Sequence, residues 1–287
     1  MEAIVLNTKK LNKIAGAIYG FAIGDAMGAT TEFMTEEQIK RKFGKVTDII
    51  GGGWLNLKAG EVTDDTQMTM CVMNALMKTL HEKDKLGFLF MLECRDEFIK
   101  WYKSKPKDIG NQCRVAISKY MMKEKRLGAC PNDEALGNGS LMRAMPCALV
   151  NNIPFNIYQG QLTHNNLKCS QVIQDYSRLI QIYINNNPYI ITIEKLLEPS
   201  GYIQNTFNNS VYWSSQETFE DAIIGAVNHG GDADTIAAIA GSLAGARFGY
   251  DAIPERWINQ LNPDVKEFLE KFKNFVFEYV QKEENMI

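Results

Sequence analysis

The sequence lacks several features that would place it in a specialised class of protein. No apolar run reaches the ~20 residues that a membrane-spanning helix needs, and the first residues lack the architecture of a signal peptide. The six cysteines include no C-x-x-C pair and the three histidines stand far apart, so zinc-site spacing is absent. A net charge of -3 provides no general attraction for nucleic acid or anionic membranes. We therefore expect a cytoplasmic protein in a reducing compartment, with neither nucleic acid nor membrane as a partner.

Helical periodicity dominates what is present. Apolar spacing predicts helices over 11–29, 65–81, 86–103, 110–123, 140–150, 166–186, 217–228, 234–248 and 264–282. Residues 189–193 are the best strand candidate, but they could equally begin a helix. Residues 36–62 look irregular, and the asparagine-rich residues 184–210 are expected to be surface structure without chemistry. We expect an all-α fold and a single domain over residues 1–287.

Glycine recurs every fourth residue in the first predicted helix, at Gly16, Gly20, Gly24 and Gly28. Each glycine in a helix costs about 1 kcal/mol relative to alanine, so close packing of another backbone is the simplest reason for the stripe. The same helix carries Asp25, which needs hydrogen-bond partners if it is buried. We expect a central helix on which other helices pack tightly, with Asp25 fixing a nearby loop.

Two acidic clusters stand directly before predicted helices. Residues Thr63 to Thr66 read TDDT, and residues Asp232 to Thr235 read DADT after a pair of glycines. One carboxylate or hydroxyl suffices to cap a helix, whereas neighbouring carboxylates repel one another unless a cation lies between them. Together the clusters offer four carboxylates, enough for two divalent cations, and all-oxygen ligands suit magnesium, calcium or manganese.

These motifs resemble those of the ADP-ribosylglycohydrolases, the family that contains dinitrogenase reductase-activating glycohydrolase and the animal ADP-ribosyl-acceptor hydrolases. The resemblance spans most of the chain, with its elements in the family order: GAIYG at 16–20, GDAMG at 24–28, TDDT at 63–66, GNGSLMR at 137–143, LTH at 162–164, GGDADT at 230–235 and GSLAGARFG at 241–249. It implies an all-α orthogonal helical bundle, two Mg²⁺ or Mn²⁺ ions, and hydrolysis of the C1″ glycosidic bond of an ADP-ribosyl group.

The resemblance also assigns residues to the metal site and to catalysis. The family's metal ligands fall on Thr63, Asp64, Asp65, Asp232, Asp234 and Thr235. Its glutamate near the metals falls on Glu32, which we favour over Glu36 and Glu37 because these lie in a polar stretch typical of a solvated helix face. Asp108 matches an aspartate close to the substrate in relatives that act on ADP-ribosyl-arginine. It could pair with a guanidinium, accept a proton or cap the helix at 110–123.

A glycine-rich segment entering a helix is the candidate for substrate binding. Small residues expose backbone N–H groups there, and a helix N-terminus favours an anion. The resemblance implies contacts with the ADP-ribose phosphates and the neighbouring ribose, and the expected substrate-binding residues are Gly110, Asn138, Gly139, Ser140, Met142, Arg143 and His164. For Arg143 the alternative is an internal structural ion pair, which we slightly favour.

The expected function is metal-dependent removal of ADP-ribose from a protein side chain, with arginine slightly favoured, or from a small ADP-ribosyl compound. The metals would hold the ribose hydroxyls and position a water. Glu32 would activate that water or assist the leaving group, and Asp108 is the second candidate. One alternative is a non-catalytic ADP-ribose-binding or structural relative. The other is a different helical metal hydrolase, such as a phosphohydrolase, although the scattered histidines argue against the His-Asp type.

Overall fold

The computed structural model describes residues 2–80, 87–122, 128–187 and 193–284, with the backbone alone for residues 2–7. Within these ranges the chain forms helices, and the β pairing is limited to two isolated bridges, Gly52–Leu57 and Gly137–Tyr202. The all-α prediction is confirmed. Among the described helices, none has both the length and the apolar character that crossing a bilayer requires.

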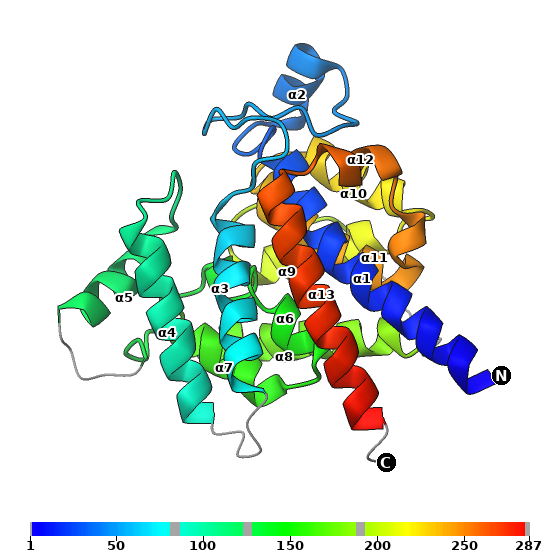
Figure 1. Cartoon of the computed structure of the whole chain (residues 1–287). Coiled ribbons are helices and arrows are strands. Elements are labelled where there is room, and N and C mark those ends of the chain that lie inside the picture. Colours follow the sequence, from blue (N-terminus) through cyan, green and yellow to red (C-terminus); the bar gives the residue numbers. More distant parts are fainter. Residues whose placement is uncertain (1, 81–86, 123–127, 188–192, 285–287) are drawn as a thin grey trace.

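Figure 1 shows how the helices are arranged in space. They are α1 (Glu2–Gly28), α2 (Glu36–Phe43), α3 (Asp64–Thr79), α4 (Gly87–Lys103), α5 (Asn111–Met121), the 3-10 turn η1 (Asn138–Ser140), α6 (Met145–Leu149), α7 (Ile153–Gln161), α8 (Leu167–Ile184), α9 (Ile203–Ser214), α10 (Phe219–His229), α11 (Ala233–Phe248), the 3-10 turn η2 (Tyr250–Ala252), α12 (Glu255–Gln260) and α13 (Pro263–Glu284).

Eight of the predicted helices match α1, α3, α4, α5, α8, α10, α11 and α13. The helix predicted over 140–150 is wrong in detail, because that stretch forms η1, a turn and the short α6. Helices α2, α7, α9 and α12 were not predicted as separate elements. Most of the strand candidate at 189–193 lies outside the described residues.

The glycine stripe of α1 lies directly against the backbone of α11. A Cβ added to Gly16 would lie 2.3 Å from the carbonyl oxygen of Gly245, and one added to Gly24 would lie 2.0 Å from that of Ala237. Gly28 meets Ala233 and Asp234 in the same way, with 2.5 Å to the carbonyl oxygen of Ala233. The two helices therefore run antiparallel with their backbones in contact, and the end of α1 lies beside the start of α11.

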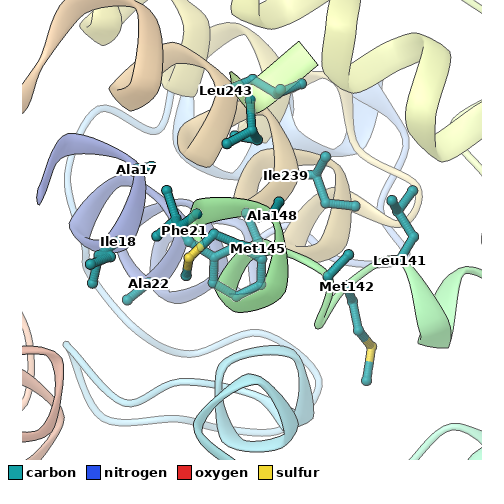
Figure 2. Close-up of a cluster of buried hydrophobic side chains, with 14 of the residues drawn as sticks. Ala17, Ile18, Phe21, Ala22, Leu141, Met142, Met145, Ala148, Ile239 and Leu243 are labelled. Atoms are coloured by element: carbon teal, nitrogen blue, oxygen red, sulfur yellow. The ribbon is translucent and has the colours of Figure 1, made fainter. Parts of the chain in front are cut away.

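A buried apolar cluster joins this helix pair to α6 and to the turn before it. Figure 2 shows side chains of α1, of the 141–142 turn, of α6 and of α11 facing one another. Met145 and Ala148 of α6 are buried with Phe21 of α1 and Leu243 of α11. Met142 belongs to this cluster and also lines a cavity, so the hydrophobic core extends to the wall of that cavity.

The asparagine-rich segment at 184–210 differs from its prediction as surface structure. It contains the start of α9, where the side chains of Ile203, Thr206 and Asn209 are buried. The amide of Asn209 bonds the backbone of Leu197 in both directions, at 2.8 and 3.1 Å. Asn209 thus satisfies backbone groups of the loop before α9, a packing role that gives no apolar periodicity in the sequence.

Candidate active site

The C-terminal end of α1 meets the N-terminal ends of α3 and α11 at one place. Asp25 of α1 accepts hydrogen bonds from the backbone N–H groups of Thr63, at 3.2 Å, and Thr66, at 3.1 Å. The prediction that Asp25 fixes a nearby loop is therefore confirmed. The hydroxyl of Thr235 on α11 donates to Asp65 Oδ2 of α3 at 3.3 Å, so the two acidic clusters are in direct contact.

The side chain that caps helix α3 is a threonine and not one of the carboxylates in the clusters. Thr63 is the N-cap of α3, and its side chain accepts from the N–H of Asp65 at 3.2 Å. Neither Asp64 nor Asp65 is needed as a cap, and both carboxylates are buried. Asp232 occupies the N-cap position of α11 without a capping hydrogen bond from its side chain. Asp64, Asp65 and Asp232 therefore do not cap a helix through their side chains.

These carboxylates line one cavity of about 380 Å³. Its described lining contains six acidic residues and neither lysine nor arginine, and the acids are Glu32, Asp64, Asp65, Asp108, Asp232 and Asp234. Thr235 also lines it, whereas Thr63 does not. An anionic ligand could not enter such a cavity unless protons or cations first neutralised the carboxylates.

The arrangement fits divalent cations. Single carboxylate oxygens of Glu32, Asp232 and Asp234 lie within 4.8 Å of one another. Oδ1 of Asp65 is buried and has no hydrogen-bond partner among the described residues, which is costly for a carboxylate oxygen unless another ligand occupies it. All donors are oxygens, as Mg²⁺ and Mn²⁺ prefer. Glu32, predicted only as a catalytic residue, thus also stands where it could contact a cation.

Burial dominates the electrostatics of these groups. It raises the pKa of Glu32 and of Asp64 to about 8 and that of Asp232 to about 6, with neighbouring carboxylates acting in the same direction. The pKa values of Asp65 and Asp234 are raised well above the ordinary range for the same reasons. Without cations, several of these groups would hold protons at neutral pH, whereas bound cations would allow them to ionise together.

Asp108 lines the cavity and does not act as a helix cap. Helix α5 begins at Asn111 with Gly110 as its N-cap, so Asp108 does not cap it. Asp108 Oδ1 accepts from the N–H of Ile109 at 2.7 Å, and the N–H of Gly110 donates to Asp64 Oδ2 at 3.1 Å. The pKa of Asp108 is raised by burial. The side chain is therefore held next to the acidic cluster and faces the cavity.

Residues of the glycine-rich segment line the cavity together with His164, and they are Gly137, Asn138, Gly139 and Met142. The side-chain amide of Asn138 donates to Asp232 and, at 3.0 Å, to Thr206 of α9. A Cβ on Gly139 would lie 2.8 Å from Cε1 of His164, so this glycine leaves room for the imidazole ring. Burial and then the charge of Arg143 lower the pKa of His164 to about 3, which keeps the ring neutral.

Arg143 and Ser140 of the same segment lie outside the cavity lining. Arg143 is fully buried and donates to Gln159 Oε1 at 2.7 Å, to the Gln159 carbonyl oxygen at 2.9 Å and to Thr163 Oγ1 at 2.6 Å. Its guanidinium also stacks over Phe98, 4.7 Å from the ring centroid. The predicted phosphate contact of Arg143 is therefore not available in this structure. The predicted ion pair is wrong as well, because within the described chain its partners are uncharged acceptors.

Two kinds of site residue escaped sequence reasoning. Phe33 and Trp54 line the cavity, and the indole N–H of Trp54 donates to Glu32. In the sequence, Trp54 follows three glycines in a segment whose composition indicates only an irregular loop. The backbone around Pro199 was missed too, although its carbonyl oxygen accepts from the N–H of Asp232 at 2.9 Å.

Comparison with known proteins agrees with this geometry. The profile of the ADP-ribosylglycohydrolase family matches residues 6–186 and 164–285. The chain is 35% identical to the ADP-ribosyl-dinitrogen reductase glycohydrolase of Rhodospirillum rubrum, over 89% of this chain and 92% of that protein. It is 28% identical to the ADP-ribosylarginine hydrolase Tri1 of Serratia proteamaculans, over 90% of this chain and 77% of that protein.

A solved structure shares the fold. It is described as an ADP-ribosylglycohydrolase-related protein complex, and it superposes with a TM-score of 0.77 at 24% identity, covering 95% of this chain and 99% of its own. The likeness at this identity concerns the fold, and the family is shown by the profile and by the Rhodospirillum rubrum relative. The chain belongs to the ADP-ribosylglycohydrolase family of hydrolases.

Proposed function

We propose that this protein removes ADP-ribose from arginine side chains of an acceptor protein in a reaction that requires Mg²⁺ or Mn²⁺. The observation that carries the proposal is the cavity whose described lining has six carboxylates and neither lysine nor arginine. A cationic guanidinium suits such a cavity, and a diphosphate can enter it only with cations. The name of the Serratia proteamaculans relative supports arginine as the acceptor.

Two divalent cations would be held by the carboxylates of both clusters and by their threonines, which are Asp64, Asp65, Asp232, Asp234, Thr63 and Thr235. Glu32 lies close enough to Asp232 and Asp234 to share a cation with them. Bound cations would supply charge neutralisation and orientation for the ribose hydroxyls and for a water. The chain contributes the remaining chemistry. Breaking the C1″ bond builds positive charge on the ribose, and a cavity lined by carboxylates stabilises that charge.

Glu32 is our candidate for moving the proton of the attacking water. Its carboxyl group is almost fully buried beside Asp232 and Asp234, and burial raises its pKa to about 8. Without cations this group would hold a proton at neutral pH, whereas bound cations would let it ionise, and an ionised carboxylate there can accept a proton from water. The indole N–H of Trp54 donates to this carboxylate and so orients it.

Asp108 is our candidate for holding the guanidinium of the acceptor. It lines the same cavity but lies on the loop before α5, whereas Asp232 and Asp234 lie at the start of α11. A carboxylate there can form a charge-assisted hydrogen bond to the leaving guanidine and keep it oriented as the bond breaks. Its role is therefore specific to the acceptor.

A panel of defined substrates tests the proposal. ADP-ribosyl-arginine, ADP-ribosyl-serine and an ester-linked ADP-ribose are incubated with the protein and Mg²⁺, Mn²⁺ or EDTA, and released ADP-ribose is measured. We expect release from the arginine compound with either metal and none with EDTA. Asp108→Asn should lower kcat/KM for that compound by about 30-fold or more, because a buried charge pair is lost, while the exposed control Asp133→Asn should not. No release from the arginine compound with either metal would refute the proposed acceptor.

A further inference from the structure

Two large aromatic side chains stand exposed at the mouth of the acidic cavity. Phe33 is 66% exposed and Trp54 is 52% exposed, although both line that cavity. Their ring centroids are 5.5 Å apart at an angle of 49°. Paired aromatic rings that face solvent beside a site are typical of a binding surface.

The pair is held by the residues that build the site. Phe33 has a φ of 62°, a left-handed conformation that costs a phenylalanine about 1 kcal/mol or more. Its N–H donates to the carbonyl oxygen of Gly231 at 2.7 Å, and the N–H of Gly231 donates to Met34 at 2.9 Å. The indole N–H of Trp54 bonds Glu32. The backbone of Phe33 and the indole of Trp54 are therefore held in place relative to the carboxylates.

A groove of about 630 Å³ begins at this pair and leads away from the acidic cavity. Glu32, Phe33 and Trp54 line both spaces, and Arg41 and Lys42 of α2 form the outer wall of the groove. In Figure 1, α2 projects from the end of the molecule where α1 ends. The groove is thus continuous with the site and basic at its far wall.

The contacts across the site show on which side of the reacting bond the groove lies. Asn138 bonds Asp232, Asp232 lies within 4.8 Å of Glu32, and Glu32 bonds Trp54. The groove is therefore separated from the glycine-rich wall by the acidic cluster. If the ADP-ribose phosphates lie along that wall, the groove lies on the side of the acceptor.

The charge of the groove indicates what the acceptor should carry. Arg41 and Lys42 are exposed, and neither pairs with a carboxylate among the described residues; Lys42 instead lies over the ring of Phe43, 4.9 Å from its centroid. Two unneutralised basic side chains attract acidic groups. In the cavity itself an acidic group would meet six carboxylates, so it can be accommodated only farther out, along the groove.

We propose that this groove binds the polypeptide that flanks the ADP-ribosylated residue. Phe33 and Trp54 pack against the chain next to the modified side chain, and Arg41 and Lys42 favour acceptors with acidic residues nearby. The inference rests on the proposed function, since it places the acceptor on this side of the bond. It adds to that function the part of the protein that would discriminate between protein acceptors. That part is α2, which does not line the acidic cavity.

The test compares three substrates. Two are ADP-ribosyl-arginine peptides of identical length whose flanking residues are glutamate in one and glutamine in the other, and the third is free ADP-ribosyl-arginine. The variant is Arg41→Glu with Lys42→Glu. The matched control is Lys40→Glu with Lys45→Glu, which makes the same change of charge at exposed residues of the same segment outside this groove.

We expect the variant to lower kcat/KM for the glutamate peptide by about 5- to 10-fold, with the effect shrinking at high salt, as for charges at the rim of an interface. For the glutamine peptide and for free ADP-ribosyl-arginine the change should stay below about 2-fold. An equal loss for all three substrates, an equal loss in the control, or no loss for the glutamate peptide would overturn the groove proposal alone. Wild-type protein that hydrolyses none of the three substrates would overturn the proposed arginine acceptor, and the groove proposal with it.

Discussion

In cation-free buffer, we expect the free energy of unfolding to fall as the pH rises from about 5.5 to about 8. Burial raises the pKa of Glu32 and of Asp64 to about 8 and that of Asp232 to about 6. In the unfolded chain these groups have pKa values of roughly 4. The folded chain therefore holds more protons over this interval. The stability that is present at low pH is lost as the pH rises through the folded-state values.

The size of the effect follows from the number of protons involved. Counting one retained proton as the minimum for the three groups, the free energy of unfolding changes by about 1.4 kcal/mol per pH unit, which is about 3.5 kcal/mol over the interval. For chains of comparable size, each kcal/mol corresponds to roughly 2 to 4 °C, so Tm should fall by roughly 7 to 14 °C. Mn²⁺ at about 100 times its Kd should restore about 2.7 kcal/mol at the upper pH.

Scanning fluorimetry of EDTA-treated, desalted protein at a series of pH values, with and without Mn²⁺, measures both effects. The variant Glu32→Gln with Asp232→Asn removes two of the titrating groups and should show a shallower fall of Tm. It should also respond less to Mn²⁺. A Tm of the cation-free wild type that stays level or rises with pH would refute the reasoning. Equal stabilisation of wild type and variant by Mn²⁺ would show that the ion binds elsewhere.

Three further substitutions test how the fold supports the site. Asp25→Asn removes the charged acceptor that orients the start of α3, and Mn²⁺ affinity measured by titration calorimetry should fall about 10- to 100-fold, whereas unchanged affinity would contradict this positioning role. Gly24→Ala places a Cβ 2.0 Å from a carbonyl oxygen of α11, and urea unfolding should show a loss of about 3 kcal/mol; Gly110→Ala, whose Cβ would meet nothing within 4 Å, is the control and should lose less than about 1 kcal/mol. Arg143→Met leaves buried acceptors unpaired and should cost about 3 kcal/mol or more; a smaller loss would mean that the Arg143 network stabilises little.

The parts of the fold that sequence predicted are those with a repeating physical signal. Apolar periodicity located the long helices, and glycine at every fourth residue indicated the contact that the structure shows between α1 and α11. The paired acids at 64–65 and at 232 and 234 indicated a shared site, because adjacent carboxylates repel without a cation, and the structure brings them into one cavity. The role of these residues as metal ligands stays a prediction.

The parts that sequence did not predict depend on contacts between distant segments. Nothing local to Trp54 shows that its indole N–H will meet Glu32. For Arg143 the sequence slightly favours an ion pair over a phosphate contact, and only the fold shows that its acceptors are uncharged. The asparagine-rich segment has no apolar period, yet Thr206 receives a hydrogen bond from Asn138. Polar packing of this kind leaves no periodic trace in a sequence.

The backbone contact between α1 and α11 makes the position of the carboxylates in the acidic cavity depend on residues that do not line it. Side chains at most helix interfaces can change rotamer to absorb a substitution, but two backbones in contact cannot. A residue larger than glycine at 16, 20 or 24 would have to separate the helices or slide one along the other. Either movement would shift Glu32 relative to Asp232 and Asp234. Loss of activity should therefore map along the whole length of this helix pair, as far as Gly16 and Gly245 at its distant end.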